Sequence, residues 1–298
     1  MYKPLLKKIF SATAALFIAM LVLPRSVQAQ EQIIYELKLA GMRVTSLNCG
    51  DLSSIDGVSG TAKFDPESKT LTLDNATIST SVIKFPGLEN SIKGLTIRLI
   101  GDNTITSENY WGLFNNTERS ITFTGSGKLT VNGSTTAPQT GYRRAIFNWG
   151  TIVVDGCTLE ANGGVYGIGS GFWKFVNCNV RTKGGGGSQS DEYAGSLTWM
   201  WDKEPEFVGC KITSPAGVSW KKFQNNGYDN YVLVGEDGNA VTDWVEITRD
   251  NTGVNAPNTD TATAKRGIYT LQGLRLSGEL KDLPAGIYIV DGKKVVKP

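Results

Sequence analysis

Carboxylates are almost the only side chains in this chain that could perform catalysis, because the sequence contains no histidine. That absence removes Ser-His-Asp and Cys-His nucleophilic sites, histidine metal ligands and imidazole acid/base chemistry. The four cysteines are spread singly rather than as paired C-x-x-C ligands, so they predict no zinc site. We therefore expect no metal and no other cofactor.

Glycoside cleavage needs a pair of acidic side chains that flank the scissile bond. Spacing in the sequence does not establish that the candidate carboxylates converge, and charged loop side chains usually face solvent. A lyase would instead use a basic residue beside bound calcium, but no Asp-rich calcium pattern lies near the Arg143-Arg144 pair. A non-catalytic protein is favoured, with a carboxylate-dependent polysaccharide hydrolase or a lyase as the enzymatic alternative. The candidate carboxylates are Asp155, Glu160, Asp191, Glu192, Asp202, Glu204 and Glu206.

Aromatic residues in turns and at strand edges support binding better than catalysis. An aromatic ring stacks on the apolar C–H face of a sugar, while neighbouring amides and guanidinium groups bind the hydroxyls. The same residues can instead pack in a core or contact another protein, and both alternatives stay open. The predicted glycan-binding residues are Trp111, Arg143, Arg144, Trp149, Tyr166, Trp173, Trp199 and Trp201.

A short pattern that recurs along the chain predicts how these residues are positioned. A turn residue, a cysteine, a variable residue and a branched apolar residue return around Cys157, Cys178 and Cys210. Earlier copies place Ala76, Asn103 and Gly127 in the cysteine slot, and successive slots are 27, 24, 30, 21 and 32 residues apart. Such loose self-similarity, in an all-β composition rich in Gly, Thr, Val and Ile, predicts a right-handed parallel β-helix.

Equivalent positions of stacked strands should form columns. The three slot cysteines are expected in one buried column, as free thiols rather than disulfides, because neighbouring parallel strands point equivalent side chains the same way. A second motif ends in Asn115, Asn148 and Ser170. These residues predict either an internal polar ladder or a solvent-facing turn.

The first 29 residues have the form of a cleavable signal peptide: a basic start, an apolar run from Phe10 to Leu23, and small residues before Gln30. The apolar run is too short to span a bilayer comfortably. The chain has 30 basic and 28 acidic residues. The signal holds four of the basic ones, so the mature chain would carry 26 minus 28, or about −2. Near-neutral charge without a basic tract argues against nucleic-acid binding.

The rest of the chain divides by composition. Residues 30–70 are expected to form an amino-terminal β cap, and residues 71–248 the parallel β-helix with a carboxy-terminal cap. Residues 249–265 are rich in Asn, Thr, Asp and Ala and predict a linker. Residues 266–298 predict a small β module.

Two stretches resemble known families. Residues 35–46, 60–66 and 70–78, which include Tyr35-Glu-Leu-Lys-Leu-Ala-Gly41 and Thr70-Leu-Thr-Leu-Asp-Asn-Ala-Thr-Ile78, resemble the start of secreted bacterial β-helix proteins loosely labelled carbohydrate-binding. The resemblance covers about 45 residues. It implies the fold and an exported setting, and it supplies no catalytic motif.

The carboxy-terminal residues look like the sorting module of Bacteroidetes exported proteins. The matching features are Tyr269-x-Leu-x-Gly273, Leu283-Pro-Ala-Gly-Ile-Tyr288 and a basic-apolar terminus. The module here is about half the usual length of such domains. The resemblance implies delivery to the cell surface, and a small β appendage with Asp291-Gly292 as its last hairpin turn is the alternative.

Together these features predict an exported cell-surface or extracellular protein, with the periplasm as the alternative location. Its partners would be a polysaccharide or cell-surface glycan and the secretion machinery, without nucleic acid and without a transmembrane segment in the mature chain. A structural or adhesive protein that binds other proteins is the second functional hypothesis.

Overall fold

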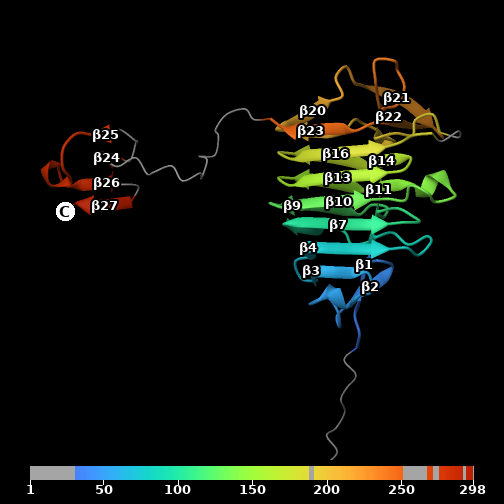
Figure 1. Cartoon of the computed structure of the whole chain (residues 1–298), viewed down its shortest axis with the longest axis horizontal. Coiled ribbons are helices and arrows are strands. Elements are labelled where there is room, and N and C mark those ends of the chain that lie inside the picture. Colours follow the sequence, from blue (N-terminus) through green and yellow to red (C-terminus); the bar gives the residue numbers. More distant parts are fainter. Residues whose placement is uncertain (1–30, 188–190, 251–266, 271–274, 291–292, 298) are drawn as a thin grey trace, which may run out of the picture. The chain divides into compact units, whose positions relative to one another are not determined.

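The computed structural model describes residues 31–187, 191–250, 267–270, 275–290 and 293–297 (Figure 1). The predicted signal peptide at 1–29 lies outside the described residues, as do residues 251–265 of the predicted linker and the Asp291-Gly292 turn. The chain separates into two compact units, which divide after Asp250. Arg249, placed in the linker by composition, belongs instead to the last strand of the first unit.

Strands of the first unit stack in three rows. After the first strands, the chain repeatedly places one strand in each row and then returns to the first row, so that three consecutive strands form a rung (Figure 1). A seven-stranded sheet is the first row: β1 (Ile34–Leu39), β2 (Met42–Thr45), β5 (Leu88–Asn90), β8 (Leu113–Asn115), β11 (Arg144–Asn148), β14 (Tyr166–Gly169) and β17 (Leu197–Thr198).

A thirteen-stranded sheet holds the other two rows. Its second row contains β6 (Leu95–Ile100), β9 (Ser120–Gly125), β12 (Thr151–Asp155), β15 (Phe172–Val176) and β19 (Glu206–Val208). Its third row contains β7 (Asp102–Ser107), β10 (Lys128–Asn132), β13 (Thr158–Gly163), β16 (Asn179–Gly184), β23 (Val245–Arg249) and β20 (Cys210–Ser214). The strand β4 (Thr70–Thr80) joins the rows, because its first half pairs with β6 and its second half with β7.

The two ends of the stack are closed by antiparallel strands. At the start, β3 (Val58–Asp65) pairs with β4, and a 3-10 turn covers Leu52–Ser54. At the other end, β23 runs antiparallel between β16 and β20. A small sheet of β18 (Met200–Trp201), β22 (Tyr228–Val234) and β21 (Ser219–Asn225) lies beside them. A further 3-10 turn covers Thr140–Tyr142.

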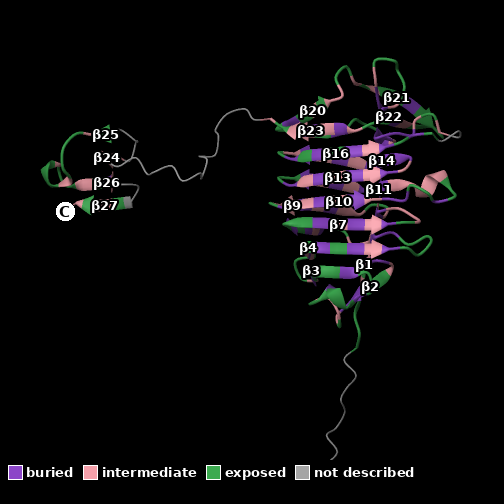
Figure 2. Ribbon diagram, in the orientation of Figure 1, coloured by how far each residue is buried: buried purple, intermediate pink, exposed green. Residues whose placement is uncertain are grey.

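The core lies between the rows. Alternate residues of each strand point inward, and the parallel register turns them into columns such as Leu95, Ile121, Ile152 and Trp173. Figure 2 shows buried positions recurring along the stacked strands. The prediction of an all-β protein built from parallel strands is confirmed, and the described residues contain no α-helix.

The cysteine column is confirmed. Cys157 and Cys178 occupy equivalent places directly before β13 and β16. The pairing of β15 with β19 sets Val176 opposite Val208, and this register places Cys210 opposite Cys178. The three side chains are buried, and all four cysteines of the chain are free thiols. Of the earlier copies of the motif, Gly127 lies opposite Cys157 as predicted, whereas Asn103 and Ala76, which lies opposite it, were aligned wrongly. Asn103 faces Leu129 in the register, two positions beyond the cysteine slot, and it stacks with the apolar column instead.

An asparagine ladder runs inside the first row. Asn90, Asn115 and Asn148 are fully buried. Nδ2 of Asn90 donates to Oδ1 of Asn115 at 2.8 Å, and Nδ2 of Asn115 donates to Oδ1 of Asn148 at 2.8 Å. The internal ladder is therefore confirmed for two of its three predicted members, and Asn90 extends it. Ser170 does not continue it, because Nδ2 of Asn148 donates instead to the carbonyls of Gly150 and Phe172, both at 3.2 Å.

The second unit is a four-stranded antiparallel sheet of β25 (Arg275–Leu276), β24 (Ile268–Tyr269), β26 (Gly286–Val290) and β27 (Lys293–Lys297). A 3-10 turn covers Leu280–Asp282. The predicted small β module is thus a sheet, and β26 and β27 flank the predicted hairpin turn.

Candidate functional site

The eight residues predicted to bind glycan do not form one row. Trp173 lies in the core, where its side chain is 3% exposed, so a sugar cannot reach it. It faces inward because its register column contains Ile121 and Ile152. The remaining predicted residues fall into two groups, one on the outer side of the first row and one at the end of the stack.

The first group is an aromatic cluster of Tyr110, Trp111, Phe114, Tyr142, Phe147 and Trp149. Its rings contact one another edge-on or tilted, with centroids from 4.1 to 6.4 Å apart. The indole N–H of Trp111 donates to the Gly141 carbonyl at 2.8 Å, which holds that ring in the cluster. Only Trp149 among the predicted residues of this cluster is well exposed, at 40%. Most of the cluster area is therefore used for packing.

The two predicted arginines are also engaged by the protein. The guanidinium of Arg144 lies over the rings of Tyr166, at 3.7 Å, and Phe147, at 4.5 Å. Burial lowers the pKa of Arg144, although the charge of Tyr166 opposes that effect. Arg143 donates from Nε to the Ala137 carbonyl at 2.7 Å. The buried ring of Tyr166 thus serves as a platform for Arg144.

The second group lines a cleft of about 450 Å³, which we call the aromatic cleft. Predicted residues Trp199 and Trp201 form part of its wall. Sequence reasoning missed most of the other members. The lining residues are Phe172, Trp199, Trp201, Asp202, Asn225, Asn226, Tyr228, Asp229 and Asn230.

Three segments build the aromatic cleft. Phe172 begins β15, and its ring contacts that of Trp201 edge-on at 6.2 Å. Trp201 is tied to the stack because its backbone N–H donates to the Gly171 carbonyl at 3.0 Å, and β18 pairs with β22. The hairpin of β21 and β22 then brings its turn, which includes Asn226, to the cleft. The Asn-Asn-Gly sequence at residues 225–227 was the available signal for that turn.

Trp199 is held in place by polar and apolar contacts. Its indole N–H donates to Oδ2 of Asp191 at 2.7 Å, and its ring contacts Phe223 edge-on at 5.0 Å. Its backbone has φ of +58°, a conformation that few non-glycine residues adopt. Asp191, considered above as a catalytic carboxylate, therefore positions a wall of the cleft. Tyr228, by contrast, is 71% exposed and free to meet a ligand.

The charged residues around the cleft are partly paired. Lys222 Nζ lies 2.7 Å from Oδ2 of Asp229, and Gln224 donates to the other oxygen at 3.3 Å. These hydrogen bonds, with that of Lys222 the stronger effect, lower the pKa of Asp229, and the same contact raises the pKa of Lys222. Glu160 and Glu206, two further candidate carboxylates, form ion pairs with Lys128 at 3.0 Å and Lys174 at 2.8 Å.

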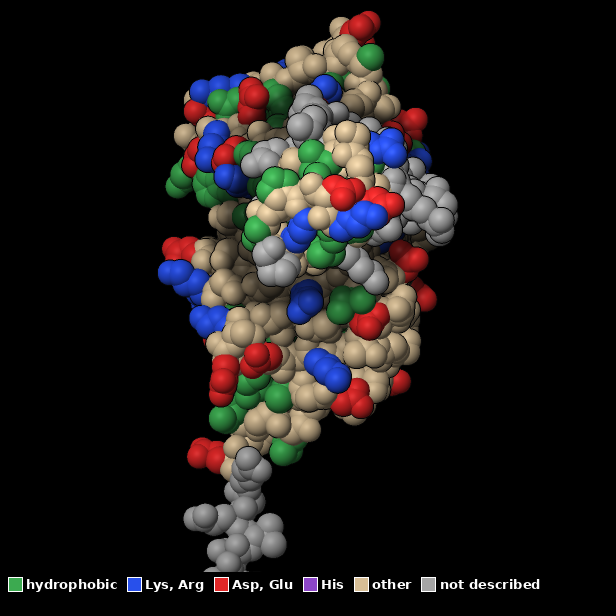
Figure 3. Space-filling view, turned by 90° about the vertical axis from the view of Figure 1, so that its left-hand side faces the viewer, with side chains coloured by type: hydrophobic (Ala, Val, Ile, Leu, Met, Phe, Trp, Pro, Cys, Tyr) green, Lys and Arg blue, Asp and Glu red, His purple; other side chains and the backbone are tan. Residues whose placement is uncertain are grey.

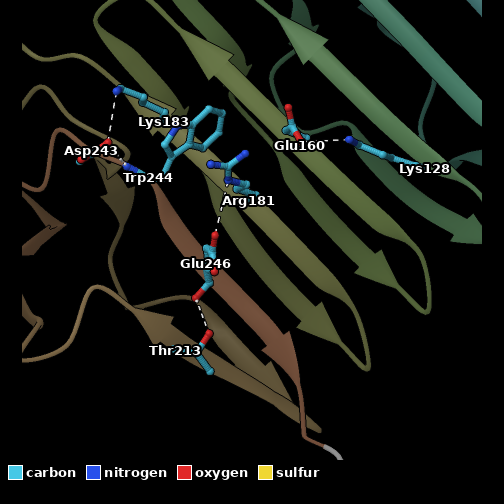
Figure 4. A network of polar contacts seen from close by, with 8 residues as sticks. All are labelled: Lys128, Glu160, Arg181, Lys183, Thr213, Asp243, Trp244 and Glu246. Atoms are coloured by element: carbon cyan, nitrogen blue, oxygen red, sulfur yellow. Dashed lines mark hydrogen bonds and ion pairs between the residues drawn. The ribbon is translucent and has the colours of Figure 1, made fainter.

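A strip of charges runs along the outer side of the third row (Figure 4). Arg181 contacts Glu246 at 3.5 Å, and its guanidinium lies 3.9 Å from the ring centre of Trp244. This tryptophan was not among the predicted site residues, and its ring is already covered by a cation. Basic and acidic side chains are interspersed over the face drawn in Figure 3. Such mixing does not offer the continuous basic surface that a phosphate backbone requires.

Among the residues that the structure describes, no group of three His, Cys, Asp or Glu side chains is arranged to hold a metal ion. The described part of the chain also has no helix long and apolar enough to cross a bilayer. Comparisons with known protein families, with curated proteins and with solved structures find no match. The candidate site therefore stands on its own geometry.

Proposed function

We propose that this protein is an exported, non-catalytic carbohydrate-binding protein whose aromatic cleft binds an extended glycan. Its first unit would be a right-handed parallel β-helix. Three rows of parallel strands filled in strict succession support the helix, and connections between parallel strands are right-handed in about 98% of cases. The predicted signal peptide and the resemblance of the last residues to a sorting module support export to the cell surface.

The aromatic cleft is the observation that carries the glycan-binding proposal. Phe172, Trp201 and Tyr228 supply ring faces or edges, and Tyr228 is largely exposed. Asn225 and Asn226 add amide groups, each of which can both donate to and accept from a sugar hydroxyl. Apolar walls with a few convergent polar groups are the usual make-up of a small-molecule site. The aromatic cluster around Trp149 is a secondary contact region.

A protein-binding, adhesive role is the second candidate, and one surface favours it. Val82, Ile83 and Phe85 are 51%, 67% and 43% exposed on one loop. Phe85 lies against Gly41, next to the exposed Met42. Exposed apolar side chains that gather in this way often mark protein contacts. This surface belongs to the start of the stack, whereas the cleft lies at its end.

We expect Trp201→Ala to weaken glycan binding about tenfold or more, because it removes a ring from the centre of the cleft. The measurement is a glycan array on residues 30–265, followed by fluorescence titration of the strongest ligand. Tyr228→Ala should also weaken binding, and because Tyr228 is largely exposed this change should leave the fold intact. Trp244→Ala is the matched control, since Arg181 covers that ring outside the cleft.

Retention of full affinity in both cleft variants would place the binding site elsewhere. Absence of binding to any arrayed glycan would reject the proposal and favour the adhesive role. Release of reducing ends or unsaturated sugars from a bound polymer would show that the protein is an enzyme.

A further inference from the structure

The aromatic cleft has an acidic lining. Among the described residues, Asp202 and Asp229 are the charged members of its wall, and no lysine or arginine lines it. Any sugar that occupies the cleft therefore meets carboxylates together with rings and amides. The net charge at the cleft depends on how far nearby cations compensate these two side chains.

Asp229 is compensated, because Lys222 lies 2.7 Å from its Oδ2 atom. Lys203 follows Asp202 in the sequence, but these two described residues form no ion pair, and the charge of Lys203 also acts on Glu206. Hydrogen bonding from Lys174 chiefly lowers the pKa of Glu206, and Lys203 adds to that effect. The carboxylate of Asp202 forms no hydrogen bond or ion pair with any other described residue. One uncompensated negative charge thus remains at the cleft.

From this charge distribution we infer that the cleft selects neutral glycans and amino sugars and excludes polymers of uronic acids. The inference rests on the proposed glycan site and specifies its ligand class. A uronate carboxylate in the cleft would be repelled by Asp202, and no lining cation would offset that repulsion. A neutral hexose is not repelled by Asp202, and the ammonium group of a protonated amino sugar is attracted to it.

The aromatic cluster does not supply the missing cation. The rings of Tyr166 and Phe147 cover the guanidinium of Arg144, and its Nε donates to the Gly141 carbonyl at 3.1 Å. Nε of Arg143 donates to the Ala137 carbonyl at 2.7 Å. Both guanidinium groups are therefore already engaged in contacts within the protein. Binding of an acidic glycan would therefore have to use a surface outside both aromatic groups.

Asp202→Asn is the decisive variant. Asp202 has φ of +57°, a conformation that asparagine tolerates as well as aspartate, so the change removes the charge and keeps the turn. Asp56→Asn is the matched control, because Asp56 is an exposed carboxylate at the other end of the stack. Both variants are titrated with oligosaccharides that share linkage and length and that carry either hexose, amino-sugar or uronic-acid units.

We expect wild-type protein to bind the hexose and amino-sugar oligosaccharides and to bind the uronate at least tenfold more weakly, with a smaller difference at high salt. Asp202→Asn should strengthen uronate binding about tenfold and so lower the ratio of hexose affinity to uronate affinity, whereas Asp56→Asn should leave that ratio at its wild-type value. Equal wild-type affinity for the hexose and uronate forms, lost in Trp201→Ala, would overturn the charge selection and keep the proposed function. An array without any ligand that depends on Trp201 would overturn both.

Discussion

Replacing Asn115 by alanine should lower the free energy of unfolding by about 3 kcal/mol. The side chain donates to Oδ1 of Asn148 and to the carbonyl of Arg119, and it accepts from Asn90, so the change deletes three hydrogen bonds. One N–H of Asn90 is then left without its partner in a fully buried position. The lost bonds and the orphaned donor add to one another because no solvent reaches the ladder.

Denaturant unfolding of the two variants Asn115→Ala and Asn116→Ala measures this effect. Asn116 is the matched control. It is the neighbouring asparagine, but it is only half-buried and donates to Ser91 Oγ at 3.1 Å at the edge of the stack. Its replacement should cost less than about 1 kcal/mol. Equal losses for the two variants would show that the buried ladder adds nothing beyond ordinary side-chain contacts.

Alkaline pH should destabilise the protein through its cysteine column. Burial raises the pKa of Cys157 to about 11, and burial together with the neighbouring thiols Cys210 and Cys157 raises the pKa of Cys178 to about 12. Both pKa values lie above the pKa of an exposed thiol, which is about 8.5. The raised pKa values therefore stabilise the folded state fully below about pH 8.5, and this stabilisation is lost as the pH rises toward the folded-state pKa values. Between pH 9 and 11 each thiol should cost up to about 1.4 kcal/mol per pH unit, and the slope due to Cys157 falls as the pH approaches 11.

The measurement is the slope of the unfolding free energy against pH over that range. Cys178→Ala should flatten the slope by about 1.4 kcal/mol per pH unit, whatever its effect on stability at neutral pH. Cys49→Ala removes a thiol that lies outside the column and is the control for the loss of a sulfur atom as such. Identical slopes in all three proteins would mean that the buried thiols do not titrate on unfolding as described.

The recurring pattern gave a reliable account of local geometry. Side chains alternate along a strand, and only small or apolar groups fit between stacked rows, so a repeated small residue before a branched apolar one marks the inside of a turn. This reasoning placed Cys157 and Cys178 correctly. It misaligned Asn103 by two positions, because a shift of two residues preserves the inward face and the pattern cannot detect it.

The binding residues were harder to predict, because the sequence pattern around an aromatic residue in a repeat is the same whether its side chain points into the core or toward solvent. Trp173 was predicted to face solvent, but its register places it in a column of core residues. Trp111 and Arg144 lie near the surface, yet neighbouring rings and carbonyls engage them. Only long-range packing distinguishes these environments.

By itself, the sequence determined the all-β class, the stacking of parallel strands and the inward-facing columns, since these follow from the two-residue period of a strand and from the cost of burying unpaired polar groups. Tertiary structure alone decided where a ligand could bind. Phe172, Trp201 and Tyr228 come from separate segments, and they meet because β18 pairs with β22 at the end of the stack. Contacts between segments so far apart in the chain depend on loop lengths and strand pairing, which no local pattern encodes.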